Sequence, residues 1–277
     1  MNGKTIVVTG ASDGIGAAAA RKLKTLGHNV IIVGRTKEKT EKIAAELGAP
    51  YHLADYSRLS DVVKLAEELK KYEKIDVLCN NAGGVLAEKQ TTEDGFEKTF
   101  QINMLGGFLL TRLLLDKLIS CGATVIQTSS IAANLFGADF DADDVQSEKD
   151  FTPFKAYGNA KLSDALIAKE FYRRYGGQGL CAVAFEPGVV RTNFAAEGKG
   201  FVKFCYHSPL KYFFTITPKK SAERLVWLAE GVAGKDFING QTYSKKKIMK
   251  FKYKGDLDAA AKKLFDTCEK MTDKFVH

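Results

Sequence analysis

The stretch TIVVTGASDGIG, residues 5–16, decides the fold of this chain. Its first part is an apolar run of strand length, and Gly10, Gly14 and Gly16 lead directly into a helical segment. Such a turn needs glycine because it is tight and its backbone must approach a pyrophosphate closely, at the positive N-terminus of a helix. Many strand-to-helix turns carry glycine for steric reasons only, so the triplet alone is a weak signal. Its place between the first strand and the first helix indicates a dinucleotide site.

The rest of the chain repeats the same alternation of strands and helices. Strand-sized apolar runs are NVIIVG, a short run ending at Asp55, IDVLCN, ATVIQTSS and LCAVAFEPG. Helix-sized amphipathic runs cover residues 14–26, 36–47, 59–72, 94–119, 154–175 and 218–230. Near-continuous β-branched strands separated by helices predict an α/β fold, a Rossmann-type doubly wound parallel sheet of about seven strands with helices on both faces.

Domain organisation follows from what interrupts this alternation. No repeat or low-complexity linker divides the chain, so we expect one dinucleotide-binding and catalytic domain over residues 1–277. Residues 137–151 are acidic and without period, which predicts an exposed loop. Residues 189–217 are aromatic and basic, and we expect them to form a substrate lid rather than a fully solvated segment. A core helix that buries these aromatic side chains is the alternative.

Composition excludes several classes of protein. The chain has 277 residues, of which 45% are hydrophobic, and its first residues do not resemble a secretory signal, so we expect none. Its most apolar stretch, residues 105–115, contains Arg112 and is shorter than the roughly 20 residues of a membrane span. Five scattered cysteines and four dispersed histidines suggest neither a disulfide framework nor a metal site. We therefore expect a soluble, cytoplasmic protein without a metal.

The net charge of +8 raises the question of an anionic partner. Six lysines lie within residues 245–254, KKKIMKFKYK, as they would in a nucleic-acid patch or a site for an anionic membrane surface. No sequence signature of a nucleic-acid-binding fold accompanies them, so a solvated edge is the favoured interpretation and no nucleic-acid partner is expected.

The end of the second strand bears on cofactor choice. It reads IIVGRTK, so Arg35 lies about 20 residues after the glycine turn, where an NAD-binding fold offers an acidic residue to the ribose. A guanidinium there, assisted by Thr36 or Lys37, attracts a 2′-phosphate and favours NADP(H) over NAD(H). An ordinary surface arginine is the alternative. Asp13 in the turn counts mildly against NADP(H), because some NADP enzymes have a basic residue there.

Four motifs in one order identify a family resemblance. They are Thr9-Gly10-x-x-x-Gly14-Ile15-Gly16, NNAG at residues 80–83, Tyr157-x-x-x-Lys161, and PGVVRT at residues 187–192. With them the sequence resembles the short-chain dehydrogenase/reductase family over nearly the whole chain. The resemblance implies an oxidoreductase that transfers a hydride between nicotinamide C4 and a carbonyl or alcohol carbon.

Four residues match the catalytic positions of that family. The resemblance implies that Ser130 orients the substrate oxygen and that Asn103 supports the proton relay through a water-mediated link to Lys161. A tyrosine pKa near 10 is too high for efficient proton transfer near neutrality. Because residues four apart share one helix face, the Lys161 ammonium can lower the pKa of Tyr157, which then acts as the general acid/base. The same lysine can bind the nicotinamide ribose.

The remaining positions are expected to bind cofactor. Asp55 matches the family's acidic residue near the adenine, and the residues after the fourth and sixth strands match contacts to the adenosine and the carboxamide. The cofactor-binding residues expected in this way are Gly10, Ser12, Asp13, Gly14, Ile15, Gly16, Arg35, Asp55, Tyr56, Asn81, Ala82, Gly83, Tyr157, Lys161, Pro187, Gly188, Val190 and Thr192.

Within the family, the pattern is most similar to the retinol dehydrogenase-like branch. The 27-residue gap between Ser130 and Tyr157 is typical of that branch, and about half that length is usual elsewhere in the family. Glu186 stands where the branch usually has histidine, NMLGG replaces its NHLGH, and we expect no membrane anchor before the first strand. The likeness is therefore one of fold and loop length.

The sequence thus predicts an NADP(H)-dependent oxidoreductase for a small lipophilic carbonyl or alcohol, such as a steroid, retinoid, polyketide or aromatic compound. A non-catalytic NADP(H)-binding regulator or scaffold on the same fold is the alternative, and a binder that works through the lysine run is a third hypothesis. The resemblance also implies a homo-oligomer, a dimer or tetramer, formed through the fourth and fifth helices of the family fold.

Overall fold

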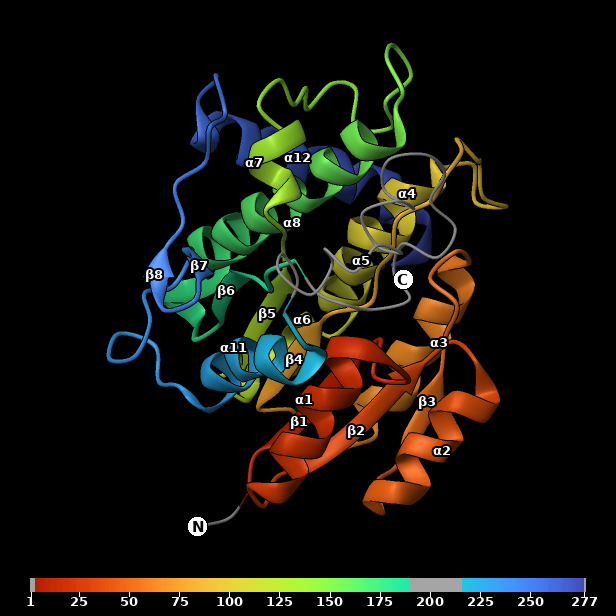
Figure 1. Cartoon of the computed structure of the whole chain (residues 1–277), viewed down its shortest axis with the longest axis vertical. Helices are drawn as coiled ribbons and strands as arrows, with labels where there is room; N and C mark the ends of the chain where they lie inside the picture. Colours follow the sequence, from red (N-terminus) through yellow and green to blue (C-terminus); the bar gives the residue numbers. More distant parts are fainter. Residues whose placement is uncertain (1–2, 190–215, 277) are drawn as a thin grey trace.

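The computed structural model describes residues 3–189 and 216–276, which build one twisted eight-stranded sheet in the order β3-β2-β1-β4-β5-β6-β7-β8 (Figure 1). Its strands are β1 (Thr5–Thr9), β2 (Asn29–Gly34), β3 (Tyr51–Leu53), β4 (Val77–Asn80), β5 (Thr124–Thr128), β6 (Cys181–Glu186), β7 (Thr242–Ser244) and β8 (Lys247–Ile248). The first seven are parallel, and β8 pairs antiparallel with β7. The predicted doubly wound sheet is confirmed, with β8 as an added edge strand.

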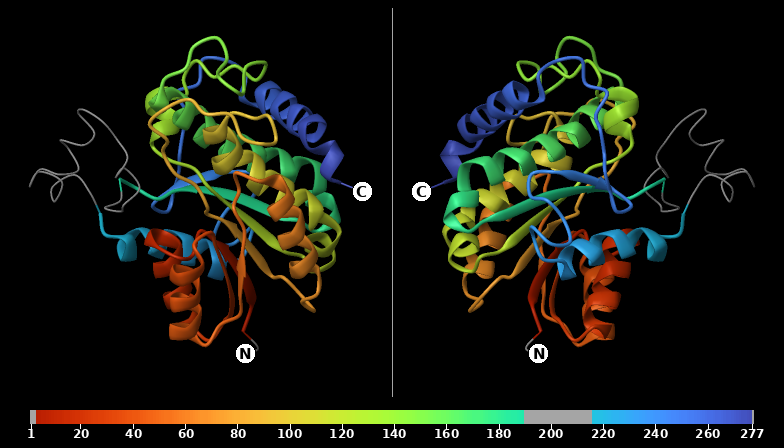
Figure 2. Two further views of the ribbon diagram at one scale, coloured as in Figure 1. Left: turned by 90° about the vertical axis from the view of Figure 1, so that its right-hand side faces the viewer. Right: turned by 90° about the vertical axis from the view of Figure 1, so that its left-hand side faces the viewer.

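Helices connect the strands and cover both faces of the sheet (Figure 2). They are α1 (Gly14–Thr25), α2 (Lys37–Leu47), α3 (Leu59–Lys70), α4 (Lys98–Phe100), α5 (Gly106–Leu113), α6 (Leu115–Ser120), α7 (Ala132–Phe136), α8 (Pro153–Tyr175), α11 (Pro218–Glu230) and α12 (Leu257–Thr272), with a π-helical turn η1 (Gln101–Leu105) and the 3₁₀ turns η2 (Gly176–Gln178) and η4 (Asp273–Phe275).

The side-chain alternation of the strands divides the core in two. In β1, Ile6 and Val8 pack with α1 and α11, whereas Val7 points to the opposite face with α3, α5 and α8. Both kinds of residue are inaccessible to solvent. This is expected of a parallel strand that is covered on both faces, and it explains why the run TIVVT is apolar without alternation.

Two expectations for individual segments were wrong. Residues 94–119 do not form one helix: the helix begins at Lys98, passes through the π-helical turn, and breaks again at Leu114. The segment 137–151 is irregular as predicted, but it is not simply exposed. Phe140, Ala142 and Val145 are buried in the main core, so alternate acidic and apolar residues tie this loop to the body of the protein.

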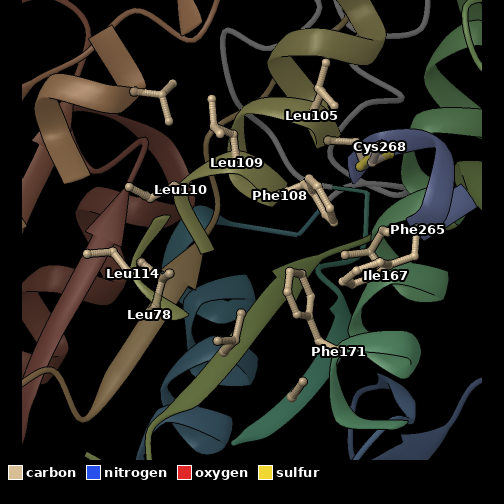
Figure 3. Close-up of a cluster of buried hydrophobic side chains, with 14 of the residues drawn as sticks. Leu78, Leu105, Phe108, Leu109, Leu110, Leu114, Ile167, Phe171, Phe265 and Cys268 are labelled. Carbon is tan, nitrogen blue, oxygen red and sulfur yellow. The ribbon is translucent and has the colours of Figure 1, made fainter. Parts of the chain in front are cut away.

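The last helix, α12, packs across α5 and α8. Phe265 of α12 lies 5.0 Å, between ring centroids, from both Phe108 of α5 and Phe171 of α8 (Figure 3). Arg174 of α8 bonds to Glu269 of α12, and Arg112 of α5 bonds to the carbonyl of the same glutamate. Helix α12 thus covers part of the helix layer through which a homo-oligomer was expected, and the oligomeric state stays a prediction.

Two kinds of feature are absent from the described part of the chain. None of its helices is both long and apolar enough to cross a membrane. Among residues 3–189 and 216–276, His, Cys, Asp and Glu form no group of three or more that could hold a metal ion.

The aromatic cluster predicts a large contribution of α12 to stability. Phe265→Ala removes a ring that is 1% exposed and leaves a cavity between three helices, so we expect a loss of about 3–5 kcal/mol in the free energy of unfolding. Urea unfolding followed by circular dichroism measures this loss. Phe136→Ala deletes the same atoms at a 41% exposed position and should cost less than half as much. Equal losses would show that α12 does not anchor the core.

Candidate active site

The turn between β1 and α1 forms a cradle that only glycine fits. Gly10 and Gly14 have φ angles of 64° and 56°, in the left-handed region that favours glycine. A Cβ atom on Gly16 would lie 2.4 Å from the carbonyl oxygen of Gly10, and one on Gly10 would lie 2.9 Å from the Cα of Ala82. The N-terminus of α1 therefore opens beside a bare backbone surface, and these residues fit the pyrophosphate of a dinucleotide.

The end of β2 packs directly against this turn. A Cβ on Gly34 would lie 2.9 Å from the Cβ of Ser12, so close contact here also requires glycine. The next residue, Arg35, is exposed beside the turn. The Asp13 carboxylate accepts a hydrogen bond from the backbone N–H of Gly14 at 2.7 Å and lies 3.5 Å from the ammonium of Lys39. Its negative charge therefore has a cationic neighbour.

Thr9 fastens the loop after β4 to the end of β1. Its hydroxyl accepts hydrogen bonds from the backbone N–H groups of Asn81 and Ala82, at 2.9 and 3.0 Å, and donates to the carbonyl of Cys79 at 3.2 Å. The side chain of Asn81 donates in turn to the carbonyl of Thr9 at 3.0 Å. The NNAG motif thus holds two adjacent strands together at their carboxyl ends, where nucleotides bind in such sheets.

Asn103 lies within the π-helical turn and holds the same loop further along. Its amide nitrogen donates to the carbonyls of Gly84 and Thr99, both at 2.8 Å, and its amide oxygen accepts from the N–H of Gly84 at 2.9 Å. A Cβ on Gly83 would lie 2.5 Å from that oxygen and 3.4 Å from the Nζ of Lys161. A side chain at position 83 would therefore meet both Asn103 and Lys161. Single π-helical turns are frequent at functional sites.

Tyr157 and Lys161 lie in the first half of α8, and both are buried, with 8% and 3% of their surfaces exposed. The Lys161 ammonium donates to the carbonyl of Thr128 and to the carboxylate of Asp164, both at 2.9 Å. It also lies 5.8 Å from the centroid of the Tyr157 ring. The expected juxtaposition of phenol and ammonium is therefore present in the structure.

The end of β5 fixes this part of α8 through the backbone as well. The buried hydroxyl of Ser129 donates to the carbonyl of Lys161 at 2.7 Å. Ser130 follows and is half-buried, and its hydroxyl accepts from the N–H of Ala132 at 3.1 Å as the chain turns into α7. A Cβ on Gly158 would lie 2.6 Å from the Cβ of Phe136, so α7 and α8 approach closely beside Tyr157.

The turn after β6 is held by a buried charge cluster. Glu186 accepts hydrogen bonds from the N–H of Gly188 and, at 2.8 Å each, from Arg224 and Ser244. Ser221 donates to the carbonyl of Pro187 at 2.7 Å. This cluster joins β6, β7 and α11 below the Pro187–Gly188 turn. Glu186 accepts these hydrogen bonds through two carboxylate oxygens, which the imidazole of a histidine lacks. Val190 and Thr192, like most of the predicted lid at 189–217, lie outside the described residues.

Asp55 and Tyr56 lie just beyond the end of β3. The Asp55 carboxylate accepts from the N–H and the hydroxyl of Ser57, at 2.9 and 2.8 Å, and it is half-buried at the edge of the site. Tyr56 is buried in the core, with its ring against Gly106. Burial raises the pKa of its phenol. A contact between Tyr56 and an adenine ring would therefore involve its backbone.

Sequence reasoning assigned no role to four residues that hold the site together: Thr9, Ser129, Gly158 and Asp164. Two of them carried a recognisable signal: Thr9 is the first residue of the glycine motif, and Asp164 lies three residues after Lys161 on the same helix. Burial raises the pKa of its carboxyl from the ordinary 3.8 to about 7, and the Lys161 ammonium limits that rise.

Comparison with known proteins agrees with this geometry. Residues 4–142 match the family model for the short chain dehydrogenases. A protein of Streptomyces sp. (strain C5) whose name describes a daunorubicin C-13 ketoreductase, DnrU, is 37% identical over 90% of this chain and 85% of its own length. Human retinol dehydrogenase 13 is 36% identical over 82% of this chain and 72% of its own length.

Among solved structures, 3-ketoacyl-(acyl-carrier-protein) reductase from Brucella melitensis, complexed with NADH, superposes with a TM-score of 0.68 over 88% of this chain and 96% of that one. At a sequence identity of 23%, this similarity shows the fold alone. The family match, the retinol dehydrogenase and ketoreductase relatives, and a turn that fits a dinucleotide all agree. The chain belongs to the short-chain dehydrogenase/reductase family, in its retinol dehydrogenase-like branch, and is a nicotinamide-dependent dehydrogenase/reductase acting on CH–OH and C=O groups.

Proposed function

We propose that the protein is an NADP(H)-dependent oxidoreductase that interconverts a lipophilic ketone or aldehyde and the corresponding alcohol. One observation carries the proposal. The buried ammonium of Lys161 is held between the end of β5 and α8, 5.8 Å from the ring centroid of Tyr157 and next to the Gly83–Asn103 contact. A phenol beside a desolvated, hydrogen-bonded ammonium is a proton donor and acceptor suited to neutral pH.

Each side chain then has a stated task in carbonyl reduction. Tyr157 gives its proton to the carbonyl oxygen, and in the reverse direction its phenolate takes the proton of the alcohol. Ser130 donates a hydrogen bond that orients that oxygen. Lys161 lowers the pKa of Tyr157 and binds the nicotinamide ribose, and Asn103 supports the proton relay. The bound nicotinamide supplies or accepts the hydride at C4.

The preference for NADP(H) rests on Arg35. Its exposed side chain follows Gly34, which packs on Ser12 of the glycine turn, and this position supports a guanidinium near the adenosine ribose of a bound dinucleotide. Asp13, which counted against a 2′-phosphate, lies beside Lys39 and would repel the phosphate less than an isolated carboxylate. The glycine turn, the loop after β4 and the Pro187–Gly188 turn complete the proposed contacts.

The lipophilic substrate class rests on two kinds of support. The names of the two relatives refer to daunorubicin, which contains a fused aromatic ring system, and to retinol. Residues 189–217 of this chain are rich in phenylalanine and tyrosine and follow directly after the Pro187–Gly188 turn. Together they favour a steroid-, retinoid-, polyketide- or aromatic-like carbonyl compound over a small polar one.

Tyr157→Phe tests the reaction. Removal of the phenol oxygen should lower kcat for NADPH-dependent reduction of para-nitrobenzaldehyde or all-trans-retinal by about 10²–10⁴-fold, because the proton donor is lost. The decrease in NADPH absorbance measures the rate, and NADPH fluorescence checks that cofactor binding survives. Tyr172→Phe, at a 40% exposed position of the same helix, is the matched control and should be fully active. Unchanged turnover in Tyr157→Phe would contradict the role of Tyr157, and a wild type that binds NADPH but turns over no carbonyl or alcohol of a broad panel would favour the non-catalytic regulator.

Arg35→Ala tests the cofactor preference. Loss of a charge-assisted hydrogen bond to the 2′-phosphate should raise KM for NADPH by about 10- to 100-fold and leave KM for NADH nearly unchanged. Arg21→Ala, which breaks an exposed ion pair with Glu46 on α2, controls for a general loss of positive charge and should change neither value. Equal effects of Arg35→Ala on both cofactors would contradict the assignment.

A further inference from the structure

Asp164 is a buried acid for which the reaction described above has no use. It is 3% exposed, it lies on α8 one turn after Lys161, and its Oδ2 accepts a hydrogen bond from the Lys161 ammonium at 2.9 Å. A buried carboxylate loses its hydration and persists only where another group compensates for that loss. Here the compensating group is the ammonium proposed to act on Tyr157.

The ammonium has three N–H donors, and two of them are occupied in the described structure. One donates to the carbonyl of Thr128 and one to Asp164. The third is left for the ribose of a bound cofactor. Asp164 therefore sets the direction in which the Lys161 side chain points. It also sets the net charge of the Lys161–Asp164 pair beside the phenol of Tyr157.

Ionisable groups on the elements packed against α8 have partners elsewhere. No ionisable side chain lies within β5, η1 or α7. Glu97 caps α4 and accepts from the N–H groups of Thr99 and Phe100, and Lys98 bonds to Gln90. On β6, Cys181 lies at the opposite end of the strand and Glu186 pairs with Arg224.

The charges between α8 and α12 are paired in a separate cluster. Asp266 and Glu269 of α12 pair with Arg174 of α8, and Asp258 pairs with Lys169. The other ionisable residues of α12 are Lys262, Lys263, Cys268 and Lys270. Lys262 pairs with Asp266, Lys263 pairs with Asp143, and Cys268 is buried in the main core. Among the described residues, the ammonium of Lys161 is thus the only charged group that bonds to the Asp164 carboxylate.

We propose that Asp164 is a positioning residue of the reaction, which holds the Lys161 ammonium in place and offsets part of the positive charge that this ammonium presents to Tyr157. The inference deepens the proposed function and rests on it. Its consequence concerns the direction of the reaction. Because the positive charge of the ammonium is partly offset, Tyr157 keeps its proton up to a higher pH. The protonated phenol is the form that carbonyl reduction requires, so Asp164 favours reduction near neutrality.

The sign of the effect follows from the charge of Asp164. Burial raises the pKa of this carboxyl to about 7, so above that pH it carries a negative charge beside the ammonium. An added negative charge near a phenol disfavours the phenolate and raises its pKa. Removal of the charge must therefore lower the pKa of Tyr157.

Asp164→Asn tests the inference, because asparagine keeps the size and one acceptor oxygen but removes the charge. The measurement is the pH profile of kcat/KM for NADPH-dependent reduction of para-nitrobenzaldehyde. Activity falls on the alkaline side as Tyr157 loses its proton. We expect this alkaline limb to move to lower pH by about one unit in Asp164→Asn. Asp164→Glu keeps the charge, and its limb should stay closer to that of the wild type.

Glu170→Gln is the matched control. Glu170 is likewise a buried acid of α8, but it pairs with Arg173 and Arg174 and lies six residues, about 9 Å along the helix, from Asp164. Its removal should leave the alkaline limb in place. Asp164→Ser provides a second charge-removing variant if the asparagine variant does not fold.

Three outcomes would overturn the inference. One is a folded Asp164→Asn or Asp164→Ser protein with an unmoved alkaline limb, and another is an equal shift in Glu170→Gln. The third is failure of both Asp164 variants to fold, which would assign the residue a purely structural role. Failure of the proposed function looks different, because Tyr157→Phe would then retain its activity whatever happens at Asp164.

Discussion

The site depends on how the end of β5 holds one turn of α8. Thr128 accepts from the Lys161 ammonium through its carbonyl, and Ser129 donates to the backbone carbonyl of the same lysine. A lysine ammonium costs several kcal/mol to bury unless its donors are satisfied. These bonds satisfy donors of the Lys161 side chain at 3% exposure, and Tyr157 lies one turn earlier on the same helix with its ring centroid 5.8 Å from the Lys161 Nζ.

Other contacts hold the glycine turn and the loop after β4 close to the Tyr157–Lys161 pair. Thr9 joins β1 to the loop after β4, and Asn103 bonds to Gly84 of that loop. A Cβ on the preceding residue, Gly83, would lie 2.5 Å from the asparagine oxygen and 3.4 Å from the lysine Nζ, so the loop passes close to both groups. The π-helical turn around Asn103 makes this possible, because an extra residue in the helix redirects a side chain without ending the helix. The glycine turn, the loop after β4 and the Tyr157–Lys161 pair thus lie close together at the carboxyl ends of the strands.

Much of this arrangement could be predicted from the sequence. Glycine spacing, continuous apolar strands and the Tyr157–Lys161 interval each reflect local geometry, so they predicted the sheet, the cradle and the helix with its two side chains. The contact of Ser129 with the carbonyl of Lys161 could not be predicted in this way, because it depends on which strand end meets which helix turn, whereas Asp164 is three residues from Lys161 on one helix and its contact is local. The π-helical turn and the three buried apolar residues of the segment 137–151 depend on packing between distant segments, which a local pattern does not encode.

The central claim is that the ammonium of Lys161 lowers the pKa of the phenol of Tyr157. The most direct measurement is the ultraviolet titration of tyrosinate in the complex with NADP⁺, taken as the difference between the wild type and Tyr157→Phe. The account predicts one tyrosine that titrates well below the ordinary value near 10, and the loss of that low titration in Lys161→Met. A difference spectrum that titrates near 10 in the wild type, or one that Lys161→Met leaves unchanged, would contradict it.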